Sequence, residues 1–123
     1  MIYGEKFLSL NEGEHFGFTG ETAEINKELD NIYKEEKAKM DKELEGSRAA
    51  FKAEDYAKAK QHCNNTIKHA NNMINRINKI NTTKMNGIGR AKRNKYIHYA
   101  TYMMDDAKVA IEEADKRMKN KGK

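Results

Sequence analysis

The fold is decided by residues 55–118, where DYAKAKQHCNNTIKHANNMINRIN (55–78) and YIHYATYMMDDAKVAIEEADKRM (96–118) flank the turn KMNGIGR (84–90). Before the turn, apolar residues recur at steps of three or four, at Tyr56, Ala59, Cys63, Ile67, Ala70, Ile74 and Ile77. The same steps follow the turn, at Ala100, Met104, Ala107, Ile111, Ala114 and Met118. This spacing is typical of a coiled-coil seam. It predicts a long antiparallel helical hairpin.

A third helix is expected before this hairpin. It should start at Thr22, a reasonable N-cap. Its apolar stripe is interrupted by Glu36 and otherwise consists of Ile25, Leu29, Ile32, Met40 and Leu44. Two ends are possible: at Gly46 and Ser47, which offer a C-cap and then an N-cap, or at residues 52–55, where Asp55 would cap the next helix.

The hairpin helices are expected at about residues 55–81 and 91–119. The predicted fold is therefore all-α and similar to a three-helix bundle, with a helical domain at 21–119, a non-helical arm at 1–20 and a frayed tail at 120–123. The last helix has a wide apolar side, which needs two neighbours. One neighbour is the second helix, and the other is either the first helix or a second copy of the chain.

Part of the hairpin resembles a known repeat family. An aromatic residue follows a turn and a small residue comes three positions later, at Asp55, Tyr56, Ala59, Cys63 and Ile67, preceded by Ala50 and Phe51. Over about thirty residues this resembles one helix pair of the tetratricopeptide family, but no second repeat and no closing proline follow. The pattern therefore indicates antiparallel helix packing, and no peptide-binding site is carried over.

Size and composition suit one small domain of 123 residues. Charged residues make up 35% and hydrophobic residues 37% of the chain, and the periodicity of the latter argues against disorder. The single cysteine, Cys63, cannot form an internal disulfide, which argues against a disulfide-stapled secreted protein. The sequence shows neither a signal-peptide pattern nor an apolar run of bilayer length. We expect a cytoplasmic protein, or one carried within a virion or other assembly.

The arm differs from the rest by its aromatic residues and glycines. Residues 7–9 and 16–18 could pair as a short β-hairpin, which is marginal on its own in water. The arm should pack on its own helices, bind a partner protein or stay mobile. The candidate protein contacts are Phe7, Leu8, Phe16 and Phe18 of the arm, with Tyr99 and Tyr102 of the last helix.

Charge is unevenly distributed along the chain. Residues 1–47 hold 12 acidic and 6 basic side chains, whereas residues 48–123 hold 7 acidic and 18 basic ones. Residues 81–99 contain no acid, and a helix N-terminus near Ala91 would add positive potential there. This basic tip suits phosphates of nucleic acid or an acidic protein, and its candidate contacts are Lys84, Arg90, Lys92, Arg93 and Lys95.

Asparagine is frequent in the predicted second helix, at positions 64, 65, 71, 72, 75, 78 and 81. Asparagine is a mediocre helix former because its side chain competes for backbone hydrogen bonds. Either an AT-rich coding sequence or a specific polar recognition face would explain this bias.

Motifs of catalytic and metal sites are missing from the sequence. His62 and His69 are seven residues apart, whereas helical zinc ligands prefer a spacing of three or four. Cys63 lies on the expected seam, where a buried thiol is inert. The glycines at 87 and 89 lack the strand and the lysine of a phosphate loop. We expect no enzymatic activity, no metal and no cofactor.

Two functions are left by these observations. The first is a structural or adaptor protein that acts through protein contacts, with self-association or a larger assembly, such as a phage virion or assembly component or an inhibitor of a host factor. The alternative is a nucleic-acid-binding protein that uses the basic tip. A membrane-surface role is disfavoured, because the acids of residues 105–115 would oppose anionic lipid.

Overall fold

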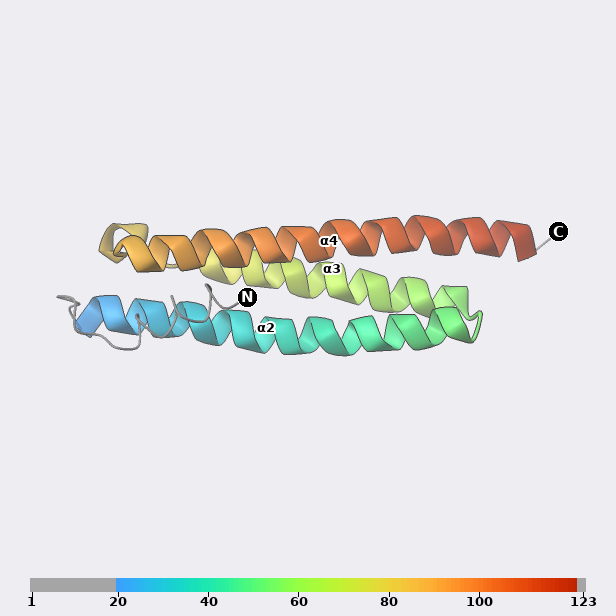
Figure 1. Cartoon of the computed structure of the whole chain (residues 1–123), viewed down its shortest axis with the longest axis horizontal. Helices are drawn as coiled ribbons and strands as arrows, with labels where there is room; N and C mark the ends of the chain where they lie inside the picture. Colours follow the sequence, from blue (N-terminus) through green and yellow to red (C-terminus); the bar gives the residue numbers. More distant parts are fainter. Residues whose placement is uncertain (1–19, 122–123) are drawn as a thin grey trace.

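The computed structural model describes residues 20–121, except for the side chains of Glu21 and Lys121. Its helices are α2 (Gly20–Lys52), α3 (Tyr56–Asn78) and α4 (Gly87–Lys121), and the 3₁₀ turn η1 (Thr82–Lys84) joins α3 to α4. Helix α3 runs antiparallel to both α2 and α4, which point the same way (Figure 1). The predicted all-α fold, a helical hairpin with a third helix, is confirmed.

Helix α2 passes through Gly46 and Ser47 without a break and ends at Lys52, the second of the two predicted ends. Gly46 is a packing residue and not a C-cap. A Cβ atom at this position would lie only 2.6 to 2.8 Å from ring atoms of His62 on α3. The absence of a side chain at Gly46 thus lets the two helices approach around the imidazole ring.

The turn between α2 and α3 is short and contains one unusual backbone angle. Glu54 has a φ of 60°, in the left-handed region that favours glycine. Asp55 then caps α3, because its side chain accepts a hydrogen bond from the Lys58 backbone N–H at 3.2 Å.

The size of the buried side chains differs between the two ends of the bundle. Near the α3–α4 turn the large buried residues are Leu29, Ile32, Met40, Met73, Ile77 and Tyr96. Toward the other end most of the buried residues are small, namely Ala50, Ala59, Cys63, Ala107 and Ala114, and Tyr56 is the large one among them. The predicted seam of α3 is partly wrong, because Thr66 and Met73 are buried while Ile67 and Ile74 are half-buried.

Helix α4 is longer than predicted at both ends. It begins at Gly87, four residues before Ala91, and continues to Lys121 beyond the α2–α3 turn (Figure 1). Met118, predicted to lie on the seam, is consequently 41% exposed.

The wide apolar side of α4 is covered within the chain, because α4 packs against both α3 and α2. The ring of Tyr33 on α2 stacks on Tyr96 with centroids 4.3 Å apart, and it meets Tyr99 edge-on at 5.4 Å. The second neighbour of α4 is therefore α2. Within residues 20–121 no helix has the length and apolar content needed to cross a bilayer.

Candidate binding surfaces

The basic tip is an ordered turn held by asparagine caps. Asn86 starts α4: its side-chain oxygen accepts from the Gly89 N–H at 2.8 Å, and its carbonyl accepts from the Arg90 N–H at 3.0 Å. The Asn81 side chain caps η1 by accepting from the Thr83 N–H at 3.0 Å. The tip therefore presents its side chains from a fixed backbone.

The five basic residues predicted for this tip have different environments. Lys84, Arg90 and Lys95 are exposed. Arg93 is half-buried, and its guanidinium donates a hydrogen bond to the Asn78 side chain at 2.8 Å, which links α4 to the end of α3. The structure thus brings at least three cations to the surface at one end of the bundle.

Lys92 points inward, which corrects its assignment to the surface. Its side chain is fully buried, and its ammonium donates to both oxygens of Asp30 at 2.8 and 2.6 Å. The Tyr96 hydroxyl donates to the same carboxylate at 2.6 Å. Burial, and then this hydrogen bond, raise the pKa of Tyr96 well above its usual range. Lys92 joins α4 to α2 and does not face a partner.

Two further polar layers join α2 to α3. Arg76 donates to the buried carboxylate of Glu36 at 2.8 Å. The Nδ1 atom of His62 lies 2.8 Å from Glu43 Oε1, which also accepts from the Asn65 amide at 3.2 Å. The hydrogen bond with His62 lowers the pKa of Glu43, and the one with Asn65 adds to this effect. Acids of the first helix thus neutralise bases of the other two within one molecule.

A large basic surplus remains after these pairings. From Tyr56 to Met104 the chain contains ten lysines and arginines and no aspartate or glutamate. Within residues 20–121, three of these ten side chains pair with acids of the bundle: Arg76 with Glu36, Lys92 with Asp30, and Lys60 with Asp115 at 2.6 Å. This acid-free segment covers all of α3, the tip and the first half of α4. It is larger than the basic stretch of residues 81–99 that the sequence suggested.

The two tyrosines predicted as protein contacts differ in exposure. Tyr99 is half-buried against Tyr33, and burial raises its pKa. Tyr102 is 63% exposed, as is Val109 one heptad later on α4. Tyr102 is therefore available to a partner, whereas Tyr99 mainly serves the core. The predicted arm contacts, Phe7, Leu8, Phe16 and Phe18, lie outside the described residues.

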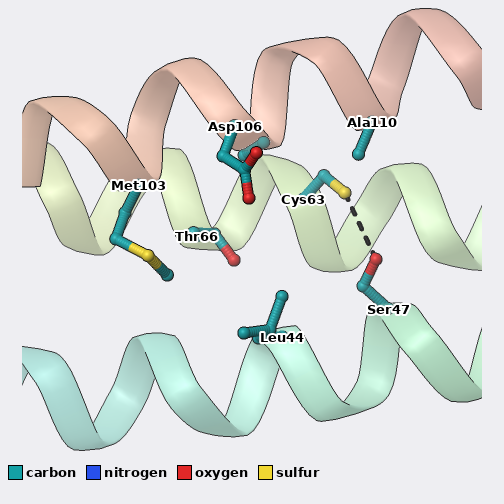
Figure 2. A pocket seen from close by; sticks show the side chains of 8 residues that line it. Leu44, Ser47, Cys63, Thr66, Met103, Asp106 and Ala110 are labelled. Carbon is teal, nitrogen blue, oxygen red and sulfur yellow. Dashed lines mark hydrogen bonds between the residues drawn. The ribbon is translucent and has the colours of Figure 1, made fainter.

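A small cavity lies between the three helices at the level of Cys63 (Figure 2). Its volume of about 40 Å³ has room for a few water molecules. Cys63 is 3% exposed, and its sulfur lies 3.4 Å from the Ser47 hydroxyl, while Asp106 stands at the α4 side. The lining combines small side chains with the larger Leu44, Met103 and Asp106. Residues 20–121 also contain no group of three histidine, cysteine or acidic side chains placed to hold a metal ion.

Comparisons with protein-family models, with curated proteins and with solved structures found no match to this chain.

Proposed function

We propose that this chain is a non-enzymatic structural or adaptor protein that works through contacts with other proteins. The observation that carries the proposal is the outer side of α4. Tyr102 and Val109 are each 63% exposed there, although α2 and α3 already cover the inner side of this helix. A spacing of seven residues places both side chains on one side of α4, two turns apart. Such a pair suits a partner helix or groove.

The partners of this proposal are proteins, in self-association or in a larger assembly. A phage virion or assembly component, or an inhibitor of a host factor, fits a small helical chain of this kind, located in the cytoplasm or within the assembly. Tyr102 is the central contact on the bundle. The aromatic residues of the arm are the further contacts that we propose.

The experiment compares the full chain with Tyr102→Ser/Val109→Ser. A matched control is Thr101→Ser/Lys108→Ser, which changes two residues seven apart on the neighbouring side of the same helix. Sedimentation velocity would measure self-association, and quantitative capture from the source cells would measure a partner. We expect the first variant to lose association and the control to keep it, with equal helicity by circular dichroism. If both variants associate equally well, the outer side of α4 is not the contact surface.

A second function, nucleic-acid binding, is favoured by one observation, the acid-free segment between Tyr56 and Met104. Its exposed cations at the tip, Lys84, Arg90 and Lys95, are grouped where α4 begins, and the helix N-terminus adds positive potential. Arg90→Gln/Lys95→Gln should weaken binding to DNA or RNA and flatten its dependence on salt. Wild-type protein that fails to bind either nucleic acid at low salt would refute this function.

A further inference from the structure

We infer that the anion-binding surface extends from the tip along the outer side of α3, and that its ligand is the phosphate backbone of a nucleic-acid duplex. This inference rests on the second function proposed above. The surface, here named the α3 outer face, consists of exposed residues at helical spacing: Gln61, Asn64, Lys68, Asn71, Asn75, Asn78 and Lys79.

The side chains of this face can donate hydrogen bonds to anions. Five carboxamides alternate with two lysines, and neither an acid nor an apolar side chain interrupts them. Amide and ammonium groups are the side chains that commonly contact phosphate and sugar oxygens. Lys68 and Lys79 have no ion pair within 4 Å among residues 20–121. Their charges are thus available to a ligand.

The exposed charges of α2, by contrast, are of both signs. Its exposed acids are Glu24, Glu28, Glu35 and Glu45, and its exposed bases are Lys27, Lys34, Lys39, Lys42, Arg48 and Lys52. The α3 outer face and the tip present no acid, so a polyanion is attracted to them without local repulsion, and the charge distribution orients the bundle on its ligand. At the tip, Arg90 and Lys84 continue the α3 outer face without an intervening acid.

An acidic protein is a poorer ligand for this face than a nucleic acid. Protein interfaces are centred on aromatic or apolar anchors and are depleted in lysine. The α3 outer face has no such anchor. Protein–nucleic acid interfaces are instead polar and positively charged. The side chains of α3 therefore match the second kind of interface.

The same lack of aromatic residues favours a duplex over a single strand. Proteins hold single strands largely by stacking bases on aromatic side chains, and none is present on the α3 outer face. From Gln61 to Lys79 the face is about 27 Å long at 1.5 Å per residue. This length approaches one turn of duplex, about 34 Å. Contacts confined to the backbone predict binding without sequence preference.

The test measures fluorescence anisotropy of a labelled duplex of about 20 base pairs, between about 50 and 200 mM salt. The variant Lys68→Gln/Lys79→Gln removes two charges from the α3 outer face. The control Lys34→Gln/Lys42→Gln removes two exposed charges from α2. Loss of two phosphate contacts should flatten the plot of log affinity against log salt by about 1.8 and weaken binding roughly tenfold to sixtyfold near 0.1 M. The control should change both quantities much less.

The tip variant Arg90→Gln/Lys95→Gln separates this inference from the function on which it rests. If the tip variant weakens binding and the α3 variant does not, the inference is overturned and the function stands. If the wild-type chain binds neither duplex nor single-stranded nucleic acid at about 50 mM salt, both are overturned. Tighter binding of a single strand than of the duplex, or equal competition by polyglutamate, would also overturn the inference. Circular dichroism of each variant checks that the helices remain folded.

Discussion

Breaking the ion pair between Lys92 and Asp30 should destabilise the fold by very different amounts, depending on which of the two residues is replaced. The Lys92 side chain is fully buried, whereas that of Asp30 is 31% exposed. Asp30→Asn leaves an ammonium group in the core without a counter-charge. Lys92→Met leaves a carboxylate that water reaches and that Tyr96 still contacts. The first change should therefore be the more destabilising one.

The magnitudes follow from the burial of each charge. Removing one partner of a buried ion pair costs about 3–5 kcal/mol, which we expect for Asp30→Asn. Lys92→Met loses charge-assisted hydrogen bonds worth about 1.5–3 kcal/mol but regains part of this by apolar packing. The double variant should be more stable than Asp30→Asn alone, because it no longer holds an uncompensated buried charge.

Urea denaturation followed by circular dichroism measures these differences as shifts of the midpoint at constant slope. Glu113→Gln, which breaks the exposed pair with Arg117, is the control and should leave the midpoint unchanged. Equal losses for Asp30→Asn and Lys92→Met, or no recovery in the double variant, would refute the inward placement of Lys92.

Three further predictions concern the turns and the tyrosines. Gly89→Ala should lower the free energy of unfolding by about 1–3 kcal/mol, because its Cβ would lie 2.7 Å from the buried Asn26 side chain. Gly87→Ala is the control: its Cβ would meet nothing within 4 Å, so this change should be neutral or mildly stabilising. Urea denaturation measures both. Glu54→Gly should raise the thermal midpoint, because it relieves a positive φ worth about 1 kcal/mol; an unchanged or lower midpoint would contradict this. Tyr96 keeps its proton in the folded state above pH 10 while the unfolded chain loses it, so stability should fall by about 1.4 kcal/mol per pH unit there, and less steeply in Tyr96→Phe.

The helical hairpin could be predicted from the sequence because its seams are periodic, but the exact buried side of α3 could not. Helix α3 packs against both α2 and α4, so its covered sector lies between two seams. Thr66 and Met73 fall in that sector, and Ile67 and Ile74 fall at its edge. Periodicity places one seam but does not show where a second neighbour lies.

The tip shows a different kind of limit. Lys92 lies four residues before Tyr96 and shares its side of the helix, and Glu36 lies midway between Ile32 and Met40. A charge within an apolar stripe indicates a buried pair, so this part of the pattern was present in the sequence. The partner of Lys92 could not be inferred, because Asp30 is 62 residues away and meets it only in one register of α2 against α4. The start of α4 was misplaced because Asn86 caps a helix that contains two glycines in its first turn.

The three polar layers also have a consequence for the evolution of this fold. Asp30 with Lys92, Glu36 with Arg76, and Glu43 with His62 each join α2 to another helix through one matched pair. Loss of Asp30 leaves the Lys92 ammonium buried without its counter-charge, and loss of Arg76 leaves the Glu36 carboxylate buried without its closest base, so the members of these pairs should change together. In a diverged sequence, loss of the acid at the position of Asp30 should be accompanied by an apolar residue at the position of Lys92. Paired replacement at these three sites would identify a distant relative even where the apolar residues of the seams have been substituted.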